Sequence, residues 1–237
     1  MTKTQINILF YFLSITLSWG QQYEFGLSIG GGNYIGDVGR ETYFMPNNIG
    51  GGLLFKNISN PWIGVRMNMN YLPIYANDKE SQSLGRQKRG LKVDGVLLDF
   101  SAGIEYNFLP RNPYIRTKSY QRNTPYMFTG LGLGAFYGTI YKNTAVSNYS
   151  GSNFFIPMIL GIKHKVNEHI IISAEISARY YFTDNLDGTK FYYNNDDEEE
   201  EYSHSIFSTN PTSNDWYTFT SFSIIYTFGD LLCYFNM

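Results

Sequence analysis

Residues 96–108 read VLLDFSAGIEYNF, and every second side chain in this stretch is apolar. Because consecutive side chains of a β-strand point to opposite faces, the alternation predicts a strand with one apolar and one mostly polar face. The apolar face carries Val96, Leu98, Phe100, Ala102, Ile104, Tyr106 and Phe108. The stretch is longer than most globular strands, and it suffices for the roughly 9 to 11 residues with which a tilted strand crosses a bilayer.

Alternation of this kind recurs eight times along the chain. The predicted strands are residues 22–32, 49–57, 62–72, 94–108, 125–138, 153–165, 168–183 and 215–229. An even number of strands closes a barrel with both chain ends on one side, which removes the sheet edges that hydrocarbon cannot satisfy. The sequence therefore predicts an all-β fold, an eight-stranded antiparallel transmembrane β-barrel with its N- and C-termini in the periplasm.

The composition agrees with a membrane barrel. Aromatic residues make up 18% of the 237 residues, while charged residues make up only 16%, below the roughly 25% of soluble domains. The net charge of −2 offers no basic surface for nucleic acid. A single cysteine, Cys233, excludes an internal disulfide.

The first twenty residues differ from the rest of the chain. Lys3 precedes an apolar stretch at 6–17, and small residues flank Trp19 before residue 21. This order is typical of a cleaved signal peptide, and the apolar stretch is too short to span a bilayer as a helix. We expect residues 1–20 to be the signal peptide and residues 21–237 to form one outer-membrane barrel domain.

The predicted connections differ between the two ends of the barrel. The outer ones, at 33–48, 73–93, 139–152 and 184–214, are long and polar. Two inner ones are short, with turn residues at 58–61 and 166–168. The third inner connection, at 109–124, is longer and carries only basic charges: Arg111, Arg116, Lys118 and Arg122.

Charged residues on the polar strand faces are predicted to fill the lumen. They are Glu24, Arg66, Asp99, Glu105, Glu175 and Arg179. Because eight strands enclose a space that side chains can fill, opposite charges are expected to pair there and leave no wide pore. Glycines 130, 132 and 134 share one strand face and leave room for bulky neighbours in the lumen.

No residue pattern in the chain indicates catalysis. A lipid hydrolase needs a base next to its nucleophile, and the three histidines, His164, His169 and His204, lie at predicted strand ends or in a loop. The acidic run at 196–201 lacks metal-ligand spacing and is typical of a solvated segment. We therefore expect no enzymatic activity, cofactor, metal or small-molecule substrate.

Five stretches distributed over the chain carry a family likeness. They are GGNYIGDVG at 31–39, TPYMFTG at 124–130, ARYYFTDNLDG at 178–188, SNDWY at 213–217 and YTFG at 226–229. In these stretches and in their order the chain resembles the PorG family, the outer-membrane barrel component of the type IX secretion system of Bacteroidota. The sequence departs from that family in its tail at 230–232 and in the acidic run of the last outer connection.

The resemblance implies a partner role. PorG-family barrels associate with a periplasmic ring built from a lipoprotein and its companion subunit. This ring supports secretion of cargo with C-terminal sorting domains and, in gliding species, motility. We hypothesise that the basic connection and Cys233 contact the ring, since basic residues suit an acidic partner and a thiol can bond to a partner cysteine.

Two other interpretations stay open at this point. A small structural or adhesive barrel would act through its outer loops. A soluble, lipid-binding barrel in the periplasm would turn its apolar face inward, around a ligand. Alternation along the strands does not distinguish the inside of a barrel from its outside.

Overall fold

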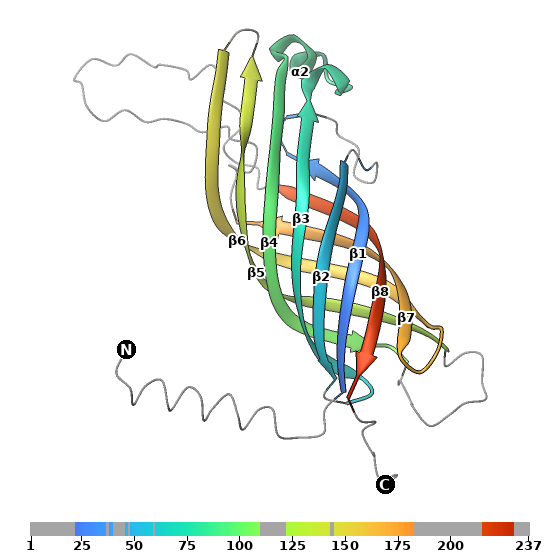
Figure 1. Ribbon diagram of the computed structural model, residues 1–237. Coiled ribbons are helices and arrows are strands. Elements are labelled where there is room, and N and C mark those ends of the chain that lie inside the picture. The colour runs from blue at the N-terminus through green and yellow to red at the C-terminus, as the bar shows by residue number, and fades with distance from the viewer. Residues whose placement is uncertain are drawn as a thin grey trace, which may run out of the picture.

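Eight strands account for most of the described chain in the computed structural model (Figure 1). The structure describes residues 22–36, 38–39, 46, 48–58, 60–109, 122–142, 145–182 and 215–229. The strands are β1 (Gln22–Ile35), β2 (Asn48–Ile58), β3 (Ile63–Asn77), β4 (Leu91–Asn107), β5 (Asn123–Lys142), β6 (Ala145–Lys165), β7 (Ile170–Tyr181) and β8 (Trp216–Phe228). A 3-10 turn η1 (Asp78–Glu80) and a short helix α2 (Leu84–Arg89) lie between β3 and β4.

The strands form one closed barrel in sequence order, and every neighbouring pair is antiparallel. The barrel closes where β1 pairs with β8, from Tyr23 opposite Phe228 to Ile35 opposite Trp216. The predicted eight-stranded antiparallel barrel is thereby confirmed. The start of β1 and the end of β8 lie at one end, here called the periplasmic end, and the opposite end is called the outer end.

Two asparagines close the tight turns of the periplasmic end. The Asn60 side-chain oxygen accepts hydrogen bonds from the backbone N–H groups of Trp62 (2.9 Å) and Ile63 (2.7 Å). Asn167 does the same for the N–H groups of His169 (2.9 Å) and Ile170 (2.7 Å). In each turn the asparagine oxygen accepts hydrogen bonds from N–H groups that would otherwise lack a backbone partner. These hydrogen bonds stabilise the short inner turns that the sequence predicts.

The strands β3 to β6 extend beyond the rest of the barrel at the outer end (Figure 1). The prediction of a long loop at 139–152 is wrong, because β5 and β6 continue to pair up to Lys142 opposite Ala145, leaving a connection of residues 143–144. The predicted loop at 73–93 is also too long, since β3 runs to Asn77 and β4 begins at Leu91. Within the described residues, no helix is long and apolar enough to span a membrane.

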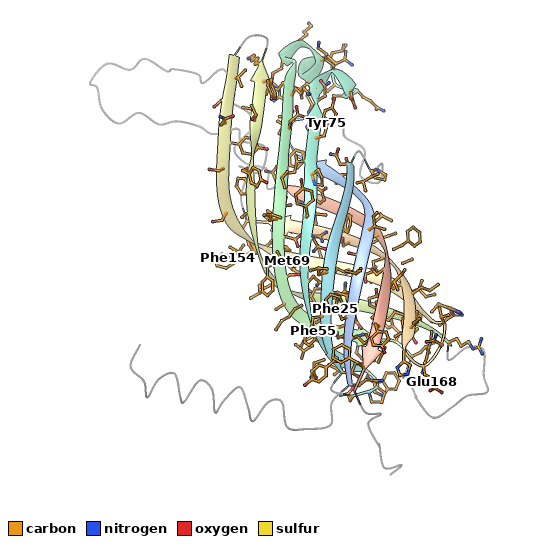
Figure 2. All side chains as sticks on the ribbon, in the orientation of Figure 1. Phe25, Phe55, Met69, Tyr75, Phe154 and Glu168 are labelled. Atoms are coloured by element: carbon orange, nitrogen blue, oxygen red, sulfur yellow. The ribbon has the colours of Figure 1, made fainter. Side chains whose placement is uncertain are left out.

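The outside of the barrel wall is apolar. Figure 2 shows Phe25, Phe55 and Met69 on this outer surface. The strands expose large apolar side chains such as Leu27, Leu131, Leu160, Ile176, Phe222 and Ile224. So large a continuous apolar surface would not remain monomeric in water, whereas hydrocarbon covers it without cost. The structure thus turns its apolar face outward, as the membrane interpretation requires.

Aromatic rings lie at both rims of this apolar surface. At the periplasmic rim, Tyr23 stacks between Phe55 and Phe228, with both pairs of ring centroids 5.7 Å apart. At the outer rim, the Tyr180 ring centroid lies 4.9 Å from that of Trp216. Such girdles are typical of membrane interfaces, where amphipathic rings sit at the level of the headgroups.

The extended part of the wall has a different outer surface. Lys92 and Asp94 form an ion pair there (2.6 Å), and both side chains are about 40% exposed: 41% and 40%. The Lys92 ammonium also lies over the rings of Tyr75 and Tyr141. A partly exposed ion pair belongs in water, so the extension projects beyond the hydrocarbon.

A charge placed on the apolar surface tests this assignment. Leu131 is 67% exposed and lies near the middle of the apolar surface. Leu131→Arg is expected to destabilise the barrel by at least about 2 kcal/mol, since a cation there must enter the bilayer midplane. The matched control is Val146→Arg on the extension, where we expect no more than about 1 kcal/mol. Unfolding in lipid vesicles measures both, and equal effects would contradict the assignment.

Candidate functional site in the barrel lumen

A cluster of buried charges fills the periplasmic half of the lumen, and Glu105 of β4 lies at its centre. Its Oε1 accepts a hydrogen bond from the ammonium of Lys56 on β2 (2.8 Å) and another from Lys163 on β6. Its Oε2 pairs with the guanidinium of Arg66 on β3 at 3.3 Å. One carboxylate thus joins three other strands of the barrel to β4 through three ion pairs.

Arg66 extends the cluster across the lumen to Glu175 of β7. Its two terminal nitrogens donate to the two carboxylate oxygens of Glu175, at 2.9 and 3.0 Å. Its Nε donates to the side-chain oxygen of Asn68 (2.6 Å), and the Tyr126 hydroxyl also donates to Glu175. This paired geometry fixes the guanidinium plane, as bidentate carboxylate contacts do.

The charges of this cluster balance. Glu24 of β1 pairs with the ammonium of Lys56, which adds a third carboxylate to the network. The inner cluster therefore holds three cations and three carboxylates, all buried: Lys56, Arg66, Lys163, Glu24, Glu105 and Glu175. Because an unpaired buried charge is strongly destabilising, the folded barrel requires equal numbers of positive and negative charges in this cluster.

A separate ion pair, outside this cluster, lies further toward the outer end. Arg179 of β7 donates from Nε to a carboxylate oxygen of Asp99 on β4, and from Nη1 to the Ser177 hydroxyl (2.8 Å). The Asn70 amide donates to the other Asp99 oxygen at 2.5 Å. Asp99 and Arg179 are both buried, and their charges cancel.

The outer half of the lumen is apolar. Buried side chains from several strands and from Val38 pack there in one cluster: Tyr34, Val38, Leu72, Ile74, Ala76, Leu91, Val93, Leu97, Phe136, Ile140, Phe155, Tyr181, Tyr217 and Phe219. Two hydroxyl groups at its edge are satisfied, since Tyr34 donates to Asp215 (2.7 Å) and Tyr217 donates to the Pro73 carbonyl (3.0 Å). The lumen is therefore closed by charge pairs at one end and by hydrophobic packing at the other.

Little empty space is left between these side chains. A cavity of about 10 Å³ borders Arg66, Glu175 and Arg179, which is room for about one water molecule. Two of the predicted small positions explain the dense filling, because Gly132 lies against the Phe155 ring and Gly134 against the Tyr181 ring. In the described part of the lumen, nothing resembles a passage for ions or for a polypeptide.

The outer opening is held by an ion pair below the short helix. The Asp78 carboxylate accepts from Arg89 of α2 (2.8 and 3.0 Å) and from the backbone N–H groups of Gly39 (3.0 Å) and Leu91 (3.0 Å). Arg86 of α2 donates to the carbonyl oxygens of Gly36 and Gly39. These contacts fasten the connection after β1 to the connection between β3 and β4.

The structure places the sequence-predicted residues as follows. All six lumen residues are buried and take part in the ion pairs described above. Sequence reasoning missed their partners Lys56 and Lys163. Of the predicted ring-binding residues, Arg122 is exposed at the periplasmic end, directly before β5, while Arg111, Arg116, Lys118 and Cys233 lie outside the described residues.

The two described histidines lie at the periplasmic end. The Nδ1 of His164 lies 2.7 Å from the Asn123 side-chain oxygen, and the Nδ1 of His169 lies 3.3 Å from the Thr227 carbonyl oxygen. His204 and the acidic run at 196–201 lie outside the described residues. Within the part of the chain that the structure describes, no group of three or more acidic, His or Cys side chains is arranged to hold a metal ion.

A family model described as a domain of unknown function, DUF6089, matches residues 3–237. The chain belongs to the DUF6089 family. No curated protein matches this DUF6089 chain significantly. The match covers the whole barrel, so the sealed lumen belongs to a DUF6089 domain.

The chain is similar in fold to a solved outer-membrane protein. A major outer membrane protein from Thermus thermophilus is 14% identical, with a TM-score of 0.51, and the alignment covers 87% of the DUF6089 chain and 99% of the other. The attachment invasion locus protein Ail of Yersinia pestis is 13% identical, with a TM-score of 0.46 and coverage of 89% and 100%. At these identities the likeness to the Thermus protein shows the fold alone, that of an outer-membrane barrel.

Proposed function

We propose that this DUF6089 protein is a non-enzymatic outer-membrane component of the type IX secretion machinery, as its resemblance to the PorG family implies. In this role it contacts the periplasmic ring, formed by a lipoprotein and its companion subunit. It thereby supports secretion of cargo with C-terminal sorting domains and, in gliding species, motility.

The sealed lumen is the observation that carries the mechanical part of this proposal. In the part of the barrel that the structure describes, balanced ion pairs and an apolar cluster fill the lumen and leave no route for cargo. A secretion component of this shape acts as an anchor, which holds periplasmic partners against the outer membrane. An exported polypeptide would then cross the membrane elsewhere in the machinery.

Among the described residues, the periplasmic end offers few surfaces for such partners. The β2–β3 and β6–β7 turns are short and closed by Asn60 and Asn167. The connection from β4 to β5 is longer, and its basic residues are Arg111, Arg116, Lys118 and Arg122. Together with Cys233 near the C-terminus, this connection is our candidate for contact with the ring. A basic segment suits a partner surface that carries carboxylates.

Charge reversal of the basic connection tests the proposal. Replacing Arg111, Arg116, Lys118 and Arg122 with glutamate is expected to reduce recovery of the ring lipoprotein at least ~10-fold, because attraction becomes repulsion. The measurement is affinity purification of the tagged barrel from detergent-solubilised membranes, with partners identified by mass. Recovery equal to that of the unchanged protein would reject this contact.

The matched control reverses charges at the outer end of the same protein. Lys79 and Lys88 are exposed there, in η1 and α2, and both are replaced with glutamate. Recovery of the ring should be unchanged in this variant. Charge-reversed barrels that still migrate as folded species in electrophoresis exclude misfolding as the cause of a loss.

An adhesive barrel is the second candidate, and the structured outer extension favours it. The β5–β6 hairpin and the Asp78–Arg89 ion pair hold structured elements beyond the membrane. Deleting residues 196–201 from the last outer connection separates the two functions. A secretion component tolerates this deletion better than the reversal of the basic connection, and the opposite order would favour adhesion.

A further inference from the structure

The register of β6 leaves half of this strand paired on one side only. With β5, β6 keeps one register from His164 opposite Asn123 to Ala145 opposite Lys142, interrupted only at Ile156 and Pro157. With β7, it pairs only from Phe155 to Lys165. Among the described residues, the last backbone contact on that side is the hydrogen bond from the Phe182 N–H to the Phe154 carbonyl (3.1 Å). Residues 146–154, here called the β6 edge, therefore border an open side of the extended wall (Figure 1).

The direction of the free backbone groups follows from that last contact. The Phe154 carbonyl points away from β5, and in an antiparallel ladder this direction recurs at every second residue. The N–H and C=O groups of Val146, Asn148, Ser150 and Ser152 thus point to the open side. All four residues are exposed, and among the described residues none of them has a backbone partner on that side.

The β6 edge lacks the devices that usually protect an open strand. Natural edges carry lysine, proline, inward charges or bulges, which prevent pairing with another chain. Residues 146–154 read VSNYSGSNF, without charge or proline, and the constant register with β5 leaves no bulge. The buried Phe136 ring packs against Tyr149 behind the strand, with centroids 6.3 Å apart, so packed side chains support the edge from the inward face.

We propose that the β6 edge is a binding site that takes up one extended, uncharged segment of another protein outside the cell, by adding it as an antiparallel strand. The backbone ladder supplies most of the affinity, so many sequences with strand propensity fit. This site lies at the opposite end from the basic connection. It functions whether or not the barrel contacts a periplasmic ring.

A second copy of the chain does not fit the edge. Copies in one membrane share the same orientation, so their β6 edges run in the same direction and can only form a parallel ladder. In such a ladder, a residue that bonds to the neighbouring strand lies opposite one that points away. Two-fold symmetry would place the same bonding residues opposite each other, and the ladder would not form.

The surface beside the edge indicates which side chains the segment carries. On the outward face, a hollow of about 350 Å³ is lined by Tyr137, Gly138, Thr139, Asn148, Tyr149 and Ser150. Tyr137, which is 51% exposed, presents its ring to this hollow. A ring-bearing side chain on the added strand fills it, while a charged one would find no partner in an edge without charge.

Hydrogen exchange of the barrel in lipid nanodiscs tests the proposal. The probe is a synthetic ten-residue peptide that alternates threonine with valine and carries one central tyrosine. With the peptide, exchange at the amides of Asn148, Ser150 and Ser152 is expected to slow at least ~10-fold, as for newly formed ladder bonds. The amides of Ser147, Tyr149 and Gly151, which point to β5, should not change.

Edge variants make the outcome specific. Asn148→Pro with Ser150→Pro removes two outward N–H groups without touching the ladder to β5, and Asn148→Lys with Ser150→Lys adds charges to the edge. Both are expected to abolish the protection, while the alanine pair at the same positions should retain it. The proposal is overturned by absent protection, by equal protection from a proline-interrupted peptide, or by protection without peptide that rises with barrel concentration, which indicates self-association.

Discussion

Glu105→Ala is expected to destabilise the barrel by about 3 to 5 kcal/mol, the loss measured when one partner of a buried ion pair is removed. Glu105 contacts Lys56, Arg66 and Lys163, so its removal leaves three buried cations with two carboxylates. Urea unfolding of the refolded barrel in lipid vesicles, followed by tryptophan fluorescence, measures the change in free energy.

Two control variants separate charge balance from loss of packing. Glu105→Ala combined with Lys163→Met restores equal numbers of charges and is expected to recover a large part of the loss. Glu168→Ala, in the exposed turn at the periplasmic end (Figure 2), should change stability by less than about 0.5 kcal/mol. An effect of Glu105→Ala below about 1 kcal/mol would show that the lumen does not depend on its charge balance.

Gly103→Ala is expected to destabilise the barrel by more than about 3 kcal/mol, at the upper end of overpacking effects. Gly103 of β4 lies opposite Gly130 of β5, and a Cβ at residue 103 would lie 2.1 Å from the backbone oxygen of Thr129. The obstacle is backbone, so no side-chain rotation relieves it. The two strands must move apart, which breaks ladder bonds inside the membrane, where water cannot replace them.

Gly85→Ala in α2 is the matched control for this substitution. A Cβ at residue 85 would meet its nearest atom, the Ser83 hydroxyl oxygen, at 3.7 Å, an ordinary contact. Alanine there is expected to be neutral or slightly stabilising. The same vesicle assay compares both variants. Similar stabilities for Gly103→Ala and the unchanged protein would mean that β4 and β5 do not approach as closely as described.

The membrane-spanning strands were predictable because two requirements act on the same residues. Hydrocarbon outside and a filled lumen inside impose a strict alternation over residues 96–108, and Phe100 and Glu105 lie on opposite faces of β4 as expected. The outer extension was not predicted because no hydrocarbon surrounds it, so only the inward face of its strands is constrained. Beyond the hydrocarbon, Asn148 and Ser150 occupy the outward face, and the strand has the polar composition of a loop.

The missed lysines were nonetheless encoded in the sequence. The short turn between β2 and β3 puts Lys56 opposite Arg66, and the turn between β6 and β7 puts Lys163 opposite Ser173. Each lysine therefore lies on the inward face of its strand, as its buried position confirms. Counting positions outward from each short turn would have found them, whereas hydrophobicity alone did not.

The apolar outer half of the lumen had no comparable signal. Leu72, Ile74, Leu91 and Val93 lie on the inward face, where a membrane barrel is expected to be polar. Three of these four fall in the stretch 73–93, for which the sequence predicts a loop. Whether these residues lie in the lumen depends on how far β3 and β4 extend. That length is decided by the pairing of the strands in the folded barrel.

Conductance of the refolded barrel in a planar lipid bilayer tests the sealed anchor most directly. Parallel electrophoresis of the same preparation, with and without heating, verifies that the protein is folded. We expect no stepwise increase in current over the bare bilayer, because ion pairs and apolar side chains fill the lumen. Stable current steps from folded protein would contradict the sealed lumen, and with it the role as an anchor.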